Sequence, residues 1–211
     1  MRPALAKQMP VAFDVSEGRE IDRALDMAAQ FGLDPIVVGA AGAAERREEL
    51  AAAKARVILS LNLPGPGGGG GAPQGGGRGG GGGTSQRQMQ FQQNAPKVPA
   101  ALAQSSIPFA FTSGGAAPAV FVRNAGRVIK EGGMTAEAVL RVLTLDAARL
   151  AGAADRTGSI ERGKIANIVI TDGDIFDGGR VRHVFIDGRP IDLTEAPAAP
   201  AGGRGGRGGG R

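Results

Sequence analysis

Residues 144–189 read TLDAARLAGAADRTGSIERGKIANIVITDGDIFDGGRVRHVFIDGR, and this stretch decides the fold. It predicts a short helix that Asp146 caps and Gly152 ends. Two turns follow, and then the mostly apolar run Ile165–Thr171 predicts a strand. A second strand, Val181–Asp187, ends on an Asp-Gly pair that tolerates the left-handed conformations of a tight hairpin. The predicted order is therefore helix, two turns and a β-hairpin.

The residues before this stretch alternate between short apolar strands and one-sided helices. The first helix shows the pattern, because Ile21, Leu25, Ala28 and Phe31 recur at helical spacing. Strands that alternate with such helices indicate a parallel sheet. The predicted strands are Val11–Val15, Pro35–Val38, Val57–Leu59 and Ile107–Thr112, and the predicted helices are Glu17–Phe31, Ala43–Ala53, Pro96–Gln104, Ala119–Glu131 and Thr135–Leu143. The sequence predicts an α/β fold with about four parallel strands.

Three segments within residues 144–189 carry a family resemblance: T-L-D-A-A-R-L-A-G, D-R-x-G-S-I-E-R-G-K-I-A-N-I-V-I-T-D-G-D and V-R-H-V-F-I-D-G-R. They resemble the C-terminal end of amidohydrolase-superfamily enzymes, particularly the imidazolonepropionase-like amidohydrolases, although none is a catalytic motif. The resemblance implies the C-terminal half of a TIM-type (β/α)8 barrel with a small β-hairpin or sandwich remnant. We expect barrel units at 1–63 and 96–150, a disordered Gly/Gln-rich insertion at 64–95, the β-sandwich remnant at 155–192 and a disordered Gly/Arg tail at 193–211.

The resemblance leaves the first half of the barrel without a counterpart in this sequence. Two explanations stay open: a truncated gene product, or a natural half barrel that dimerises or joins a separately encoded N-terminal half. Four strands would leave two unpaired edges and an uncovered inner face, which invite pairing with another chain. The expected partner is therefore a second copy or a missing N-terminal half.

Catalysis in this family depends on one or two divalent metals that activate water. Their ligands lie at the carboxyl ends of the barrel strands. The resemblance implies a His-x-His pair on strand one, His residues after strands five and six, and an Asp after strand eight. The positions that correspond to the last three carry Phe13-Asp14-Val15, Val38-Gly39-Ala40 and Thr112-Ser113-Gly114-Gly115. We expect Zn or Mn in complete relatives and no cofactor in this chain.

Few side chains offer metal-binding chemistry. Asp14 is the one candidate ligand, because carboxylates bind Zn, Mg or Mn, and the competing interpretation is a strand-end residue that caps the next helix. His183, the single histidine, lies in the final hairpin and is interpreted as structural or exposed. Lys164 resembles the Lys of the family's Gly-Lys turn, and we assign it a structural role. The catalytic residues stay unknown.

Two functions follow. The first is an amidohydrolase-family hydrolase of carbon–nitrogen (non-peptide) bonds that acts on a small amide or cyclic amide, present as a C-terminal fragment without independent activity. The second is a non-catalytic interaction module, in which the half barrel pairs with another chain and the Gly/Arg tail binds acidic partners or RNA. A chain that binds metal and is active would favour the enzyme, whereas a metal-free, inactive, folded dimer would favour the module.

Two glycine-rich tracts hold many of the 37 glycines, and the net charge is +5 without any Cys. The insertion would emerge on the catalytic face, either as a lid or as a tolerated low-complexity loop. Arg204, Arg207 and Arg211 in the tail resemble RNA-binding RGG segments, but aromatic residues are missing there and three arginines give weak binding. Nucleic acid is therefore not the expected partner. The lack of Cys excludes disulfides and thiolate ligands.

The sequence gives little information on a membrane span or a signal peptide. No apolar run reaches the roughly 20 residues of a membrane span, and residues 1–10 lack the apolar core of a signal peptide. Complete relatives are often exported, so the compartment stays unknown.

Overall fold

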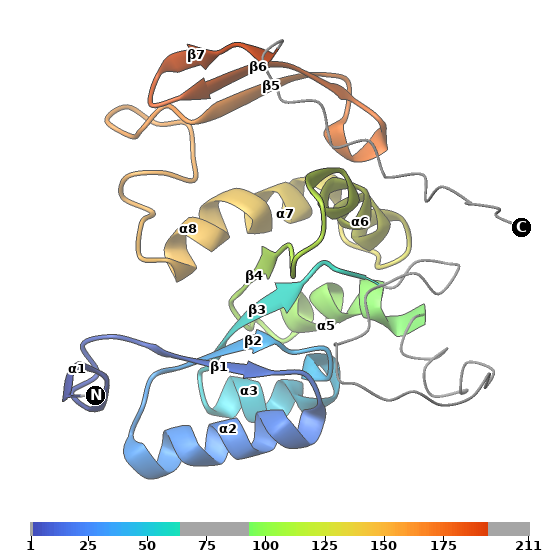
Figure 1. The fold of residues 1–211 in the computed structure, drawn as a ribbon. Coiled ribbons are helices and arrows are strands. Elements are labelled where there is room, and N and C mark those ends of the chain that lie inside the picture. Colours follow the sequence, from blue (N-terminus) through green and yellow to red (C-terminus); the bar gives the residue numbers. More distant parts are fainter. Residues whose placement is uncertain (1, 64–92, 194–211) are drawn as a thin grey trace, which may run out of the picture.

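The computed structural model describes residues 2–63 and 93–193, which form a four-stranded and a three-stranded sheet with helices (Figure 1). Most of the predicted insertion lies outside the described residues, as does the tail with Arg204, Arg207 and Arg211. Among the described residues, no helix combines the length and the apolar character needed to cross a membrane.

The larger sheet is parallel throughout, as predicted. Its strands are β1 (Val11–Val15), β2 (Pro35–Gly39), β3 (Arg56–Ser60) and β4 (Phe109–Thr112), and they lie in the order β1-β2-β3-β4. Each strand therefore pairs with the next one along the chain. All four carboxyl ends consequently lie at the same edge of the sheet.

Three helices connect these strands: α2 (Gly18–Phe31), α3 (Arg47–Ala52) and α5 (Val98–Gln104), with 3-10 turns η1 (Ala43–Arg46) and η2 (Ala95–Lys97) before α3 and α5. The short helix α1 (Arg2–Leu5) precedes β1, and α6 (Pro118–Lys130) follows β4. Figure 1 shows α2 and α3 together on one side of the sheet. The predicted strand–helix alternation is thus confirmed.

Helix α2 has defined ends. The Glu20 carboxylate accepts hydrogen bonds from the backbone N–H groups of Ser16 (2.7 Å) and Glu17 (3.1 Å), and these bonds hold the pKa of Glu20 below its usual value. Gly32, at φ 63°, ends the helix in the left-handed conformation. The predicted apolar face is correct for Ile21, Leu25 and Ala28, which are buried, but wrong for Phe31, which is 53% exposed.

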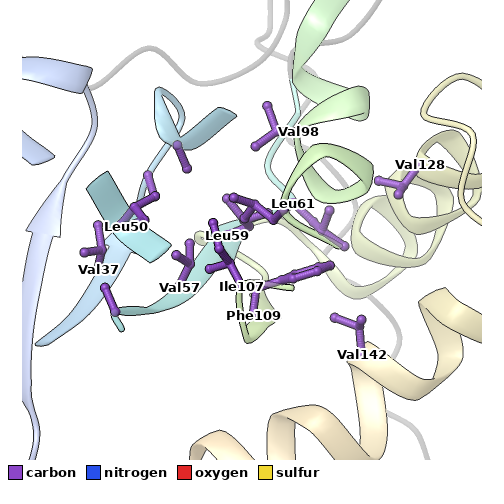
Figure 2. Packing of buried hydrophobic residues seen from close by; sticks show 14 of the residues in the cluster. Val37, Leu50, Val57, Leu59, Leu61, Val98, Ile107, Phe109, Val128 and Val142 are labelled. Atoms are coloured by element: carbon purple, nitrogen blue, oxygen red, sulfur yellow. The ribbon is translucent and has the colours of Figure 1, made fainter. Parts of the chain in front are cut away.

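The core lies between the sheet and these helices. Figure 2 shows Val37, Leu50, Val57, Leu59 and Phe109 pointing into one shared cluster. Side chains that are 0% exposed come from every layer: Ile21, Leu50, Val37, Val57, Leu102 and Val128. Burying each such side chain is worth about 1.5–3 kcal/mol relative to exposing it, so this cluster is the main source of stability.

The last helix differs from the prediction. Instead of two helices separated at Asp146, α7 (Ala136–Arg141), the π-helical segment η3 (Val142–Asp146) and α8 (Ala147–Leu150) run on without a break. The cap at Thr135 is as expected, since its hydroxyl accepts from the Ala138 N–H at 3.1 Å. Asp146 is not a cap, because it has helical dihedral angles and its carboxylate binds Arg141 and Arg149. Gly152, at φ 68°, lies just past the helix end.

The smaller sheet is antiparallel and consists of β5 (Ile168–Asp172), β6 (Arg180–Ile186) and β7 (Arg189–Ile191). Its last turn is the predicted hairpin, with Asp187 and Gly188 both at positive φ (52° and 73°). The first strand starts at Ile168 rather than Ile165, because the Ile165 N–H donates to the Arg156 carbonyl and the Asn167 N–H donates to the Ile165 carbonyl. A 3-10 turn, η4 (Ile175–Asp177), joins β5 to β6.

Turn η4 attaches the small sheet to the α/β part. Phe176 packs against the hydrophobic core, and its carbonyl oxygen lies so close to α6 that a Cβ on Gly126 would be 2.6 Å from it. Beside it, Lys130 Nζ lies 2.5 Å from Asp177 Oδ1. This ion pair raises the pKa of Lys130 and lowers the pKa of Asp177.

Candidate functional site

The carboxyl ends of the four parallel strands form the candidate site. Backbone bonds join neighbouring ends here: the Ala40 N–H donates to the Val15 carbonyl at 2.7 Å, and the Leu61 N–H donates to the Thr112 carbonyl at 2.8 Å. These bonds extend the sheet ladder by one residue past the strands. In open and closed parallel sheets, ligands bind at this edge.

Asp14, the predicted candidate ligand, lies on β1 with its side chain exposed. In the register of the sheet it lies beside Val38, which lies beside Ile58, which lies beside Ala110. This row offers one carboxylate and three apolar side chains. The alternative role of Asp14 as a helix cap is wrong, because Glu17 and Glu20 form the start of α2.

No metal-binding group forms around Asp14. Within residues 2–63 and 93–193, no three His, Cys, Asp or Glu side chains come close enough to hold a metal ion. The position after β2 is Ala40, which is buried and has no donor in its side chain. Zn and Mn sites in proteins need several carboxylate or histidine ligands. The single carboxylate at this edge therefore does not fit such a site.

The position expected to carry the strand-eight carboxylate is Gly114. Its backbone is left-handed (φ 56°), and a Cβ placed there would lie 2.0 Å from Ser60 Oγ. Asn62 secures this arrangement, since its Nδ2 donates to the Gly114 carbonyl at 3.3 Å and its backbone N–H donates to Ser60 Oγ at 3.2 Å. Gly114 also donates to Thr112 Oγ1 at 3.5 Å. The loop after β4 thus rests directly on the end of β3, in a space that only glycine fits.

Sequence reasoning missed this polar cluster of Ser60, Asn62, Thr112 and Gly114. Its members come from the ends of β3 and β4 and the loops after them, and Asn62 and Gly114 are 52 residues apart, so no local pattern joins them. It also missed Asn124, the one buried polar residue reported among the described residues, whose Nδ2 donates to the Leu61 carbonyl at 2.7 Å. The signal in the sequence for this contact was Asn124 itself, a single amide among the buried residues of α6.

A small cavity lies beside this cluster. Its volume is about 100 Å³, and its walls are the segments after β2 and β3 together with the start of α5: Gly39, Ala41, residues 59–63, Ala95, Val98 and Pro99. The lining contains no acidic side chain and no histidine. It can hold an apolar group or a few water molecules, and it offers no general acid or base.

The remaining candidates lie elsewhere. His183 is exposed on β6 beside Ile170, in the small sheet. Lys164 is nearly buried, and its Nζ binds Ser159 Oγ at 2.5 Å and Glu161 Oε1 at 3.2 Å. Hydrogen bonds from Ser159 and then Lys164 lower the pKa of Glu161. These contacts tie together the turn before β5.

Comparison with known proteins finds a family likeness for part of the chain. Residues 88–191 match the model of the amidohydrolase family. No curated protein matches the chain.

Solved structures give the fold. An amidohydrolase from Thermotoga maritima superposes with a TM-score of 0.71 at 22% identity, over 90% of this chain and 45% of that one. A prolidase complexed with N-methylphosphonate-L-proline gives a TM-score of 0.63 at 19% identity, over 90% and 47% of the two chains. An adenosine deaminase from Xanthomonas campestris with bound zinc gives a TM-score of 0.56 at 21% identity, over 87% of this chain and 45% of that one.

The chain spans slightly less than half the length of these structures. The predicted α/β fold, the C-terminal half of a TIM-type barrel with a small β unit, is confirmed by the four parallel strands and by these superpositions. The match of residues 88–191, slightly less than half of the chain, is a likeness to the amidohydrolase family, and the superpositions show the fold.

Proposed function

We propose that this chain forms one half of the barrel of a hydrolase that cleaves carbon–nitrogen bonds in a small amide or cyclic amide, and that it depends on metal ligands from outside the described residues. The family match supports the reaction class, as do structural neighbours named amidohydrolase, prolidase and adenosine deaminase. One observation supports the dependence: Gly114 replaces the expected carboxylate, in a conformation that leaves no room for a side chain.

A divalent metal in such enzymes lowers the pKa of bound water and polarises the carbonyl of the substrate. The described residues do not fit a metal, so they take no part in that step. What they offer at the carboxyl edge is the hydroxyl groups of Ser60 and Thr112 and the amide of Asn62. Such groups donate and accept hydrogen bonds, which suits them to orient an amide substrate rather than to activate water.

The test is metal binding and turnover by the full chain. After incubation with Zn or Mn and dialysis, we expect far less than one metal ion per chain by mass spectrometry. We also expect no hydrolysis of a panel containing a hydantoin, an imidazolone, an X-Pro dipeptide and adenosine. One tightly bound metal per chain, with turnover that a chelator and the Asp14→Ala variant both abolish, would contradict the dependence on outside ligands.

A non-catalytic interaction module is the second candidate, and the surface of the small sheet favours it. In the register of this sheet, Val169 lies beside Val184 and Val184 beside Ile191. Val169 and Ile191 are 55% and 43% exposed, and Ile186 is 55% exposed. Exposed apolar residues gathered on one sheet are typical of association sites. A metal-free, inactive and well-folded dimer in analytical ultracentrifugation would favour the module.

A further inference from the structure

The sequence contains three Asp-Gly pairs, and all of them lie in or beside the small sheet: Asp172-Gly173, Asp177-Gly178 and Asp187-Gly188. Such a pair can react within the main chain, because glycine has no Cβ to shield its amide nitrogen from the side chain of the preceding aspartate. The three pairs share this chemistry. Their reactivity in the folded chain therefore depends on what holds each carboxyl group and each glycine nitrogen.

The reaction forms a succinimide. The glycine nitrogen attacks the Cγ atom of the protonated aspartate carboxyl group, and the N–Cγ bond forms. One molecule of water leaves, made from the carboxyl hydroxyl group and the N–H proton. A second water molecule then opens the ring at either of its carbonyl groups, so that the products are aspartate and isoaspartate. The reaction needs only water, and the mass of the chain does not change.

Cations hold two of the three carboxylates. Asp172 Oδ2 accepts a hydrogen bond from Arg182 Nη2 at 2.6 Å, and Asp177 Oδ1 accepts one from Lys130 Nζ at 2.5 Å. The hydrogen bond from Lys130, together with its charge, lowers the pKa of Asp177, which disfavours the protonated form that reacts. Both hydrogen bonds also fix the position of the carboxyl group, so that it is less free to meet the glycine nitrogen.

The carboxylate of Asp187 has no such partner. It is exposed, and in the part of the chain that the structure describes no hydrogen bond or ion pair holds it. The backbone of the pair is held instead: the Asp187 N–H donates to Asn167 Oδ1 at 2.9 Å, and the Gly188 N–H donates to the Ala166 carbonyl at 3.0 Å. The attacking nitrogen is therefore engaged until the turn opens.

This turn has little to keep it closed. It joins β6 to β7, a strand of three exposed residues (Arg189–Ile191) that pairs with β6 alone among the described strands. Short, exposed elements with few buried contacts open at the lowest free energy. Asp187 also has a left-handed backbone, at φ 52°, which is less favourable for aspartate than for glycine. The two hydrogen bonds to residues 166 and 167 are consequently the main restraint on the reaction.

We propose that Asp187-Gly188 is the site of isoaspartate formation in the small sheet, and that opening of the turn away from Ala166 and Asn167 sets its rate. Isoaspartate places the Cβ atom of residue 187 in the main chain, so the turn gains an atom. Because the turn fixes the register of a hairpin, β7 then loses its pairing with β6. This inference goes beyond the proposed function and does not depend on it.

Ageing of the full chain at neutral pH and physiological temperature tests the proposal. Trypsin separates the sites, because residues 165–180 carry Asp172 and Asp177 whereas residues 183–204 carry Asp187. Electron-transfer fragmentation then locates isoaspartate. In the folded chain we expect at least threefold more isoaspartate at Asp187 than at either other site, and in guanidinium chloride similar amounts at all three. Equal amounts in the folded chain, or the same excess at Asp187 after unfolding, would overturn the proposal.

Variants test the two restraints separately. Asn167→Ala removes one acceptor of the turn and should raise the rate at Asp187 at least twofold without changing Asp172. Asn94→Ala is the matched control, because Asn94 is exposed and its side chain caps no helix; it should change neither rate. Arg182→Gln removes the partner of Asp172 and should raise the rate there at least twofold. An unchanged rate at Asp187 in Asn167→Ala, or an equal rise at Asp172, would overturn the role of the turn.

Hydrogen exchange measures the consequence for the sheet. In the aged chain, the isoaspartate fraction should exchange the amides of residues 184–186 faster than the unmodified fraction, because β7 no longer pairs with them. Equal exchange in the two fractions would contradict the loss of pairing. None of these measurements involves metal binding or turnover, so this proposal and the proposed function can fail separately.

Discussion

Two features of Gly114 exclude a side chain from the candidate site: its left-handed backbone and the close approach of Ser60. A left-handed backbone costs a residue with a side chain about 1–2 kcal/mol, and the contact with Ser60 adds a steric cost. The loop after β4 is thus built for glycine. A carboxylate at this position would require the loop to move away from the end of β3.

Restoring the carboxylate should therefore damage the fold rather than create a metal site. We expect Gly114→Asp to lower the free energy of unfolding by about 2–5 kcal/mol in urea denaturation, the sum of backbone strain and overpacking. Ser60→Ala in the same chain should recover part of this loss, because it removes the 2.0 Å contact. Gly115→Ala is the control: Gly115 is also left-handed (φ 82°) but has open space around its Cβ position, so only strain should appear.

Asn124 gives a second prediction at this scale. Its side chain is 3% exposed and satisfies the Leu61 carbonyl at the end of β3. Asn124→Ala would leave that carbonyl buried without a partner, so we expect a loss of about 1–3 kcal/mol in the free energy of unfolding. Asn167→Ala is the matched change, because Asn167 is exposed and accepts from the Asp187 N–H. If both variants lose the same free energy of unfolding, the burial of Asn124 does not explain the loss.

At the scale of elements, local signals predicted most of the fold. Apolar runs located all four parallel strands, and Gly32 and Thr135 marked helix ends correctly. The error at Asp146 has a physical reason. Asp favours helix starts through its side chain, but here Arg141 and Arg149 occupy that carboxylate, and the helix continues through it as a π-turn. These partners are local, five residues before and three residues after Asp146, so the sequence held a signal for an ion pair that competed with the signal for a helix start.

The contact between α6 and η4 supplies a prediction about elements. In an isolated helix, Gly126→Ala would be stabilising by up to about 1 kcal/mol. Here the new Cβ would meet the Phe176 carbonyl oxygen at 2.6 Å, so η4 must shift. We expect lower thermal stability and faster hydrogen exchange across residues 168–186. Gly18→Ala, whose Cβ would meet only the Arg46 side chain at 3.4–3.5 Å, should show neither effect; a stabilised Gly126→Ala would mean that η4 does not pack there.

On the scale of the whole molecule, the candidate site was less predictable than the fold. The sequence indicated which positions lack metal ligands, and it singled out Asp14. It could not show that Ser60, Asn62 and Gly114 meet, because that contact depends on β3 and β4 pairing across the long connection between them. The cavity lined by Arg56, Phe109 and Arg141 was missed for the same reason, since it requires β3, β4 and the last helix together.

The ion pair between Lys130 and Asp177 joins helix α6 to turn η4 and should make the attachment of the small sheet depend on pH. The lowered pKa of Asp177 means that its contribution is complete at neutral pH and lost as the pH falls through that depressed pKa. The raised pKa of Lys130 means that its contribution is lost only as the pH rises through the folded value. Asp177→Asn should therefore destabilise the chain at pH 7 and converge with the wild type in strong acid, as measured by urea denaturation at several pH values. A difference that stays constant with pH would exclude the ion pair as its cause.

The order β1-β2-β3-β4 has a consequence for how the chain folds. Every parallel pairing joins strands that follow one another in sequence, but the connection from Ser60 to Phe109 is much longer than the others. Closing a longer loop costs only about 0.6 kcal/mol more per doubling of its length, yet it delays the contact it must form. In pulse-labelling experiments, amides of β1 to β3 should therefore gain protection before those of β4, so the three strands that include Asp14 would assemble first.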